Sequence, residues 1–421
     1  MKKTLPNKKE YIIGAIVLVA YLLFGAFGLG SSMLFFRMLV GLSFGYALAR
    51  GAFGFAGSTN RASRTGSTKL MRSLMWMVTV TAIATTGFVV FSDSTEWSLW
   101  INPINFGLLI GGLFFGCGMA FSSCCATGVL TDVIEGPSRG LITLLFFGLG
   151  VFLGFPLQAT KSWITTSWFN STSYSNGVYL PDLFKWDGLN GYVGAIIFTI
   201  ICASIVVIFA RRYEQKRKDN NTYTGVVTEV EDVQNVPTNY KFFSMENYQK
   251  LFIDTWSLRK AATMIVITFV VLMAVSKAGW GASTPYGFWF ARILHLFGAN
   301  VDTLAAFMHK PANLITDPFF SIAINVQNFS IIMGTIICAL LQGRLLATLK
   351  AGFTITLKEL LLFAAGGLLM GLGTRFANGC NVGAFYTPIA NLSLSGWIYV
   401  IFLFSGGFLG NIIWKKVYNR K

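Results

Sequence analysis

The sequence predicts an all-α polytopic membrane protein, an inverted-repeat helical bundle with about ten transmembrane spans and short re-entrant helices. Of its 421 residues, 54% are hydrophobic and only 12% are charged, whereas soluble domains carry about 25% charged residues. Apolar runs of about 20 residues favour helices over the shorter, alternating strands of a barrel. A third observation, an apolar segment that occurs twice, predicts the repeat.

The predicted spans are ten apolar runs of the chain. They cover residues 11–30, 33–49, 70–91, 107–130, 140–160, 190–210, 261–277, 318–341, 360–378 and 396–414. An even number of spans separates each basic region of the chain from the next. Because loops rich in lysine and arginine remain in the cytoplasm, this parity predicts that all the basic regions and both chain termini are cytoplasmic.

The formal net charge of +16 raises the question of nucleic acid as a partner. Most of the basic residues flank the apolar runs, as the positive-inside rule requires. No basic stripe interleaved with aromatic residues lies on a soluble module. We therefore expect the lipid bilayer as a partner, and no nucleic acid.

A glycine-rich apolar segment occurs twice in the chain. The first copy, residues 111–128, reads GGLFFGCGMAFSSCCATG, and the second, residues 366–383, reads GGLLMGLGTRFANGCNVG. Eight positions match at a constant offset of 255 residues. The matches include one cysteine pair and three glycine pairs, which are Cys125/Cys380, Gly116/Gly371, Gly118/Gly373 and Gly128/Gly383. The glycines permit either close packing of helices or a break in the helix.

Span parity gives the two copies opposite orientations in the membrane. The first would run from the outside inward and the second from the inside outward, as expected of an inverted repeat.

The chain is predicted to divide into four parts. They are 1–32 for a tail and leading helix, 33–160 for the first repeat, 161–260 for an external loop, connecting helix and cytoplasmic linker, and 261–421 for the second repeat and basic tail. The connectors 51–66 and 279–315 must each enter and leave on one side, which predicts re-entrant hairpins.

Cys125 and Cys380 are the residues that most clearly suggest function. A buried cysteine is usually a small, inert hydrophobic residue, but a matched pair in an inverted repeat would converge near the pseudo-two-fold axis. A neutral thiol is a weak, polarizable hydrogen-bond donor, and conduction needs weak binding. The pair therefore predicts a path for a soft anion that ends in sulfur or selenium, with Cys124 as a further, open candidate.

The sequence contains no pattern for a metal or a redox cofactor. None of the six cysteines has Cys-x-x-Cys spacing, and the two histidines, His295 and His309, lie far from them in sequence. A zinc site is therefore not expected. No haem, flavin or dinucleotide pattern accompanies the cysteines, so no cofactor is predicted. A membrane thiol-redox enzyme or sulfurtransferase remains the alternative to a transporter.

Arg375, Ser123 and Asn378 are polar candidates for the same path. Arg375 lies in the second copy, at the place of Ala120 in the first. An arginine within a span is costly and is a functional candidate by default; it would either attract an anion or snorkel to the interface. Ser123 and Asn378 would either donate hydrogen bonds to an oxyanion or bond to the backbone of their own helices.

The two copies resemble the sulphur-transport motifs of the YeeE/YedE family of bacterial membrane proteins. The stretch from Arg50 to Gly57 is also similar to that family, and the resemblance covers most of the chain outside 211–260. It implies an inverted-repeat helical fold with short re-entrant helices and a narrow central path for thiosulfate uptake across the bacterial inner membrane. The family's motif cysteines pass thiosulfate along through hydrogen bonds, a role that falls here on Cys125 and Cys380.

The resemblance also implies a partner and leaves the choice of substrate open. Members of the family often work with a small cytoplasmic sulfur-carrier protein of the TusA type. Some carry an additional cysteine in a hairpin of the Phe-Cys-x-x-Gly type, where this chain has Gly54 after Phe53. Related members are associated with selenium metabolism, so a selenium-containing anion is an alternative substrate.

Overall fold

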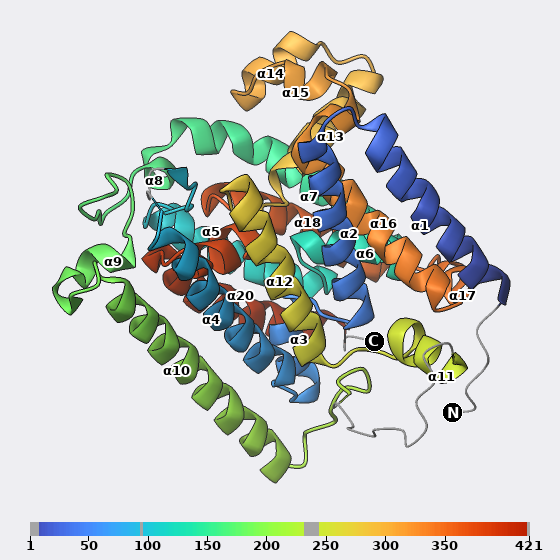
Figure 1. Ribbon diagram of the computed structural model, residues 1–421, viewed down its shortest axis with the longest axis horizontal. Helices are drawn as coiled ribbons and strands as arrows, with labels where there is room; N and C mark the ends of the chain where they lie inside the picture. Colours follow the sequence, from blue (N-terminus) through green and yellow to red (C-terminus); the bar gives the residue numbers. More distant parts are fainter. Residues whose placement is uncertain (1–7, 93–95, 231–243, 419–421) are drawn as a thin grey trace.

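The computed structural model describes residues 8–92, 96–230 and 244–418 (Figure 1). Within these ranges the regular structure is helical, and β-pairing is limited to three isolated bridges. Ten stretches of the described chain are long and apolar enough to cross a membrane. The chain is therefore an all-α polytopic membrane protein, as predicted. The basic residues expected at the two termini, in 1–7 and 419–421, lie outside the described residues.

Each of the ten predicted spans corresponds to one of these stretches. Eight are single helices: α1 (Lys8–Gly28), α2 (Ser32–Arg50), α4 (Lys69–Val89), α7 (Pro137–Thr160), α10 (Tyr192–Asp219), α12 (Leu258–Ser276), α16 (Ala323–Leu341) and α20 (Leu394–Tyr418). The other two are broken helices. They are α5 (Phe106–Ser122) followed by α6 (Ala126–Glu135), and α18 (Leu357–Phe376) followed by the π-helical turn η5 (Asn381–Tyr386) and α19 (Thr387–Ala390). The duplicated segments fall on these two broken helices.

Short helices fill the connectors that the sequence predicts to be re-entrant. The first connector holds α3 (Gly57–Thr65), which packs against α20 and α4. The second holds α13 (Thr284–Leu296), which packs against α7, together with α14 (Val301–Met308) and α15 (Asn313–Thr316). The other short helices are α8 (Ser162–Thr165), α9 (Leu180–Leu183), α11 (Met245–Tyr248) and α17 (Leu345–Ala351).

Local sequence signals fix where the two broken helices begin. The Asn105 side chain caps α5 by accepting a hydrogen bond from the Leu108 amide at 3.0 Å. Thr356 and Glu359 form a capping box at the start of α18, in which each side chain bonds to the other residue's amide. Each cap provides a hydrogen-bond partner for amides that would otherwise lack one at the start of the helix.

The helix contacts follow the two-fold correspondence that the duplicated segment predicts. The repeats match α2 to α12, α4 to α16, α5 to α18 and α7 to α20. Under this matching, the contact of α7 with α18 corresponds to the contact of α20 with α5. In the same way, the contact of α2 with α16 corresponds to that of α12 with α4, and α5 packs against α18 at the centre (Figure 1). These reciprocal contacts support the two repeats, whose boundaries at 33–160 and 261–421 stay a prediction.

Basic segments that are far apart in the chain meet at one end of the molecule, which we call the basic end. Arg217 and Lys415 both donate to the Ser63 carbonyl, at 3.1 and 3.0 Å. Arg344 forms an ion pair with Glu135 at 2.6 Å. The loops that flank α3, the end of α10, the start of α17 and the end of α20 therefore lie together, as span parity requires.

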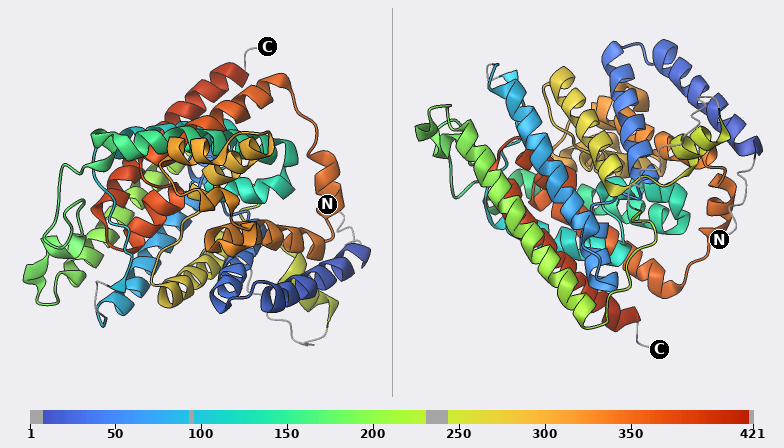
Figure 2. Two further views of the ribbon diagram at one scale, coloured as in Figure 1. Left: turned by 90° about the horizontal axis from the view of Figure 1, so that it is seen from above. Right: turned by 60° about the horizontal axis from the view of Figure 1, so that its bottom comes forward.

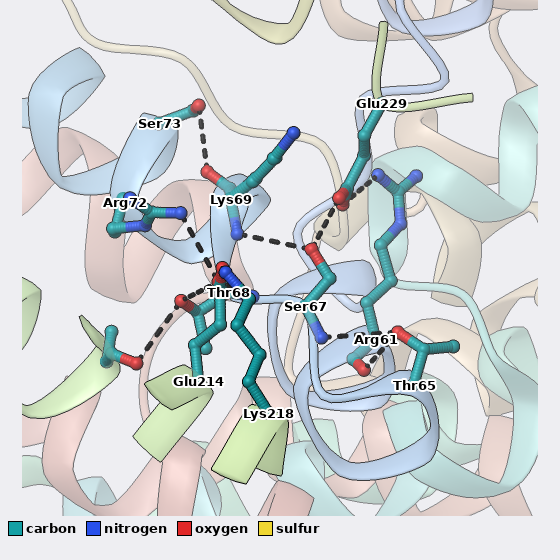
Figure 3. Close-up of polar contacts among 11 residues, drawn as sticks. Arg61, Thr65, Ser67, Thr68, Lys69, Arg72, Ser73, Glu214, Lys218 and Glu229 are labelled. Carbon is teal, nitrogen blue, oxygen red and sulfur yellow. Dashed lines mark hydrogen bonds and ion pairs between the residues drawn. The ribbon is translucent and has the colours of Figure 1, made fainter. Parts of the chain in front are cut away.

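The segment 220–230 after α10 packs against α3 rather than running free as a linker. The Thr224 amide donates to the Thr65 carbonyl at 2.9 Å. Glu229, which is 7% exposed, forms an ion pair with Arg61 at 3.1 Å and accepts a hydrogen bond from the Ser67 hydroxyl (Figure 3). The rest of the predicted linker includes residues 231–243, which lie outside the described residues.

Candidate functional site at two broken helices

The first broken helix turns at the duplicated cysteine. Ser123 follows α5 in the left-handed backbone conformation (φ 59°, ψ 14°), and α6 begins after Cys125. Cys125 is the N-cap of α6, because its Sγ accepts a hydrogen bond from the Gly128 amide at 3.3 Å. The first amides of a helix carry a partial positive charge. The Cys125 thiol therefore lies at the positive end of a half-helix.

The second broken helix repeats this geometry. Asn378 is also left-handed (φ 56°), and it stands 255 residues after Ser123, the offset of the duplicated segments. Cys380 precedes η5 with an extended backbone (φ −89°, ψ −166°) that is similar to that of Cys125 (φ −122°, ψ −175°). The Gly383 amide faces the Cys380 thiol. Each repeat therefore places one cysteine at the start of a short helical segment inside the protein.

The two cysteines converge in the interior. Cys125 and Cys380 are 1% and 0% exposed, and their thiols lie within electrostatic range of each other. Tyr286 and Tyr399 are also within electrostatic range of both thiols. The Tyr286 hydroxyl donates to the Ala126 carbonyl at 2.6 Å, whereas the buried Tyr399 hydroxyl has no hydrogen-bond partner among the described residues. Two thiols, an unpaired hydroxyl and the starts of two helical segments together suit a small anion.

A cavity of about 370 Å³ extends from Cys125 to the basic end, and we call it the basic vestibule. Its wall is formed by the turn between α5 and α6, the loop before α3, α3 itself and the 220–230 segment. Ser123 and Cys124 line the vestibule together with Arg61 and Arg64. Two of the predicted path residues, besides Cys125, are therefore brought to one cavity.

The carboxylates that line the basic vestibule are paired with arginines. Asp132 forms an ion pair with Arg139 at 2.8 Å, and Glu135 pairs with Arg344 at 2.6 Å. Arg64, in contrast, has no carboxylate partner among the described residues. The vestibule therefore keeps a positive charge next to the cysteines, which favours an anion.

Arg64 holds the Ser123 turn in place. Its guanidinium donates to the Ser123 hydroxyl at 3.0 Å, to the Ala120 carbonyl at 2.7 Å and to the Asn411 side chain at 3.0 Å. It also stacks on Trp414, with 3.9 Å from the guanidinium carbon to the ring centroid. The Ser123 hydroxyl therefore accepts a hydrogen bond from an arginine of α3, whereas the sequence also allowed it to bond to its own helix backbone.

Arg375 lies toward the opposite end of the molecule and is 4% exposed. Its guanidinium donates to the side chains of Gln158 at 3.3 Å, Ser283 at 3.3 Å and Thr284 at 3.2 Å. Within the described part of the chain no carboxylate pairs with it. Its burial favours anion attraction over snorkelling, because the positive charge stays in the interior.

Asn378 and Lys310 extend the surroundings of Arg375. Gln158 accepts from Arg375 and donates to the Asn378 side chain at 2.6 Å, so the left-handed residue of each repeat is tied to an arginine. The Lys310 ammonium and the Arg375 guanidinium lie 5.6 and 5.3 Å from the centroid of the same ring, Phe155. Burial and the nearby Arg375 lower the pKa of Lys310. Positive charge therefore lies on both sides of the thiol pair.

Comparison with known proteins identifies the family. The family model described as sulphur transport matches residues 50–409, which is most of the chain and includes both broken helices. The chain belongs to the sulphur-transport family. The resemblance that the duplicated segments suggested is thus confirmed.

The relatives that are similar to this chain are named as transporters. The thiosulfate transporter TsuA of Spirochaeta thermophila is 25% identical over 389 residues, which cover 89% of this chain and 97% of that protein. Two proteins named probable transporter YedE are each 25% identical to this chain. The one from Salmonella typhimurium matches over 168 residues (38% of this chain, 39% of the relative), and the one from Escherichia coli matches over 164 residues (38% of each). These names favour transport over enzyme activity.

Four of the family member's motif glycines let helices approach backbone to backbone. A Cβ at Gly116 would meet a backbone carbonyl oxygen of α20 at 2.2 Å, and one at Gly371 would meet the corresponding oxygen of α7 at 2.5 Å. Gly118 faces a carbonyl of α18 at 2.5 Å, and Gly373 faces a carbonyl of α5 at 2.8 Å. None of the four has a positive φ. They serve packing, and the breaks are made by non-glycine residues instead.

Replacing Gly371 with alanine is expected to lower the free energy of unfolding by about 1–3 kcal/mol, because overpacking a tight contact has this cost. The matched control is Gly87→Ala in α4, where a Cβ would meet nothing within 4 Å. Thermal unfolding of the purified proteins in detergent should give a lower midpoint for Gly371→Ala alone. Equal midpoints for the two variants would contradict the packing role.

The remaining cysteines are placed as packing residues. All six are free thiols. Cys117 donates to the Gly406 carbonyl at 3.2 Å, Cys338 lies 3.7 Å from the Gln342 side-chain oxygen, and Cys202 is half-buried on α10. Where the structure describes the chain, no group of three or more histidine, cysteine or acidic side chains is arranged to hold a metal ion.

Several residues of the site lie outside the duplicated segments and were not predicted. Tyr286 and Tyr399 are aromatic residues in apolar stretches, which the sequence alone does not distinguish from ordinary core residues. Arg64 is visible in the sequence only as one charge of a basic loop. The prediction that 51–66 and 279–315 are re-entrant was the available signal, because these connectors bring Arg64 and Tyr286 to the cysteines.

Proposed function

We propose that the protein takes up thiosulfate, or a similar sulfur-containing anion, across the bacterial inner membrane. The observation that carries this proposal is the meeting of Cys125 and Cys380, each at the start of a short helical segment. Thiosulfate presents a terminal sulfur and three oxygens. Thiols donate weak hydrogen bonds to the soft sulfur, while the helix amides and the Tyr399 hydroxyl stabilise the negative charge. Family membership and the similarity to TsuA support the same substrate class.

The proposed path runs from Arg375 past Cys380 and Cys125 into the basic vestibule. Arg375 attracts the anion and compensates its charge at the opposite end of the molecule. The two thiols then act as successive stations, whose weak hydrogen bonds release the anion again. Arg64 and Cys124 receive it in the vestibule.

The proposed orientation places the basic end and both termini in the cytoplasm. Loops rich in lysine and arginine remain on that side of a bacterial inner membrane. The basic vestibule would then deliver the anion to the cytoplasmic surface. A small sulfur-carrier protein of the TusA type would be the partner at that surface.

Uptake of radiolabelled thiosulfate into proteoliposomes tests the proposal. Unlabelled thiosulfate and selenosulfate should compete with the label, because both end in a soft atom. Sulfate, which has only oxygens, should compete at least tenfold less strongly if the thiols select for the terminal atom. Absence of uptake, or equal competition by sulfate, would contradict the proposal.

Replacing Tyr399 with phenylalanine is expected to lower uptake about tenfold, the effect of one lost hydrogen bond to a charged ligand. The same change should leave the thermal midpoint equal or higher, because the buried hydroxyl has no partner in the protein. Tyr386→Phe is the matched control, because its equally buried hydroxyl bonds to Thr81 at 2.9 Å. That control should lower stability by about 1 kcal/mol and leave uptake per folded molecule unchanged. The reverse pattern would exclude Tyr399 from the path.

A further inference from the structure

A second hollow of the protein lies outside the proposed path. It is a groove of about 780 Å³ between α4, α10 and α12 at the basic end. Apolar side chains of these helices form much of its wall: Met75, Trp76, Val80, Ile200, Val207, Ile208 and Leu258. Among the membrane-spanning helices, α10 makes its main contact with α4, and Figure 2 shows it at the edge of the bundle. Ile200 and Ile208 are 41% and 49% exposed, so the groove borders on the lipid.

The polar end of the groove carries basic side chains. Lys69, Arg72, Arg211 and Arg259 line it, and Glu229 is the acidic residue among the described lining residues. The Glu229 carboxylate is already bonded to Arg61 and Ser67 outside the groove, and Arg72 pairs with Glu214 at 3.3 Å (Figure 3).

Arg211 and Arg259 have no carboxylate partner in the described chain. The Arg259 guanidinium lies 5.2 Å from the centroid of the Trp76 ring, at the boundary between the basic end and the apolar wall. A stacked guanidinium still offers N–H donors at its edge. Two arginines are thus available to an anionic group at the mouth of an apolar groove.

We infer that this groove binds an anionic glycerophospholipid. The phosphate would lie between Arg211 and Arg259, and an acyl chain would run along the apolar wall between α4 and α10. Basic pockets between membrane helices on the cytoplasmic side bind such headgroups. A small soluble anion would leave the apolar wall unused. A zwitterionic lipid would bring an ammonium group toward the arginines. The charge at the mouth therefore favours a lipid with net negative charge.

Native mass spectrometry of the delipidated full-length protein, titrated with phosphatidylglycerol and with phosphatidylcholine, tests this inference. The parent protein should bind phosphatidylglycerol at least tenfold more tightly. The double variant Arg211→Gln/Arg259→Gln should lose about fivefold in affinity for each arginine, the typical contribution of a basic residue near an anionic surface. Its affinity for phosphatidylcholine should change little.

Arg212→Gln is the matched control, because Arg212 is adjacent in sequence, exposed and not part of the groove lining. Thermal midpoints of all variants verify that they are folded. Equal binding of the two lipids by the parent would overturn the inference, and so would an equal loss in Arg212→Gln and the double variant. Displacement of phosphatidylglycerol by millimolar thiosulfate would also overturn it, since the groove would then be a general anion site.

Discussion

Thiosulfate uptake is expected to fall about tenfold or more when Cys380 is replaced by alanine, and by a similar factor when Cys125 is replaced by serine. Hydrogen bonds to charged groups contribute about 1.5–3 kcal/mol, which corresponds to about 10- to 150-fold. Alanine removes the donor at Cys380, whose side chain forms no cap bond to η5. Serine at position 125 keeps the cap of α6 and is a strongly preferred N-cap residue. It replaces the soft thiol by a hard hydroxyl that interacts less well with sulfur.

The thermal midpoints of the two variants distinguish a loss of transport from misfolding. Both variants should unfold close to the thermal midpoint of the parent, because serine at position 125 keeps the cap of α6 and the Cys380 side chain makes no cap bond to η5. Cys202→Ala is the matched control, since Cys202 lies on α10 away from the broken helices, and its uptake should equal that of the parent. Parental uptake by both site variants would contradict the proposed path. A covalent sulfur adduct on Cys125 or Cys380, with no flux, would instead favour the sulfurtransferase alternative.

The duplicated segment made the essential part of the fold predictable. Its offset and the parity of the basic loops place one copy in each repeat, and the reciprocal contacts of α5 with α20 and α18 with α7 agree with that placement. Cys125 and Cys380 could be selected because each has an equivalent in the other copy. Such a selection needs a long-range match rather than local propensity, and inverted repeats supply it.

The breaks themselves could not be located from the sequence. Ser123 and Asn378 adopt left-handed conformations, although glycines stand nearby in both copies. Short polar side chains tolerate this conformation, but here tertiary partners accompany it. Arg64 bonds to Ser123, and Gln158 bonds to Asn378. Those partners are far away in the chain. The predicted span 107–130 therefore ran through the first break, and the predicted span 360–378 ended at the second without including the helical segments that follow it.

The role of Tyr399 and the packing of the 220–230 segment could not be predicted from the sequence for a similar reason. Tyr399 lies in an apolar run that any span would contain, and its proposed role rests only on the unpaired buried hydroxyl, which is within electrostatic range of both thiols. The 220–230 segment has a polar composition typical of linkers. Its packing on α3 combines the backbone hydrogen bond from Thr224 to Thr65 with the buried carboxylate of Glu229, which pairs with Arg61. Composition does not reveal such a specific pair.

Replacement of Arg375 by glutamine is expected to reduce thiosulfate uptake by at least about thirtyfold, within the range for a lost charge-assisted hydrogen bond. The side chains to which the buried Arg375 donates are neutral, and no described carboxylate compensates its charge. An uncompensated charge in the interior destabilises a membrane protein. The substitution should therefore leave the thermal midpoint unchanged or raise it, even though transport is lost.

A lysine at position 375 distinguishes charge from geometry. It keeps the positive charge but cannot span Gln158, Ser283 and Thr284 with a planar guanidinium, so it should recover part of the lost uptake. Arg212→Gln removes an exposed arginine of the basic end and serves as the control for the loss of one positive charge. If Arg375→Gln unfolds at a clearly lower temperature and transports normally per folded molecule, Arg375 is a structural residue. If it retains stability and loses uptake, its buried charge acts on the anion.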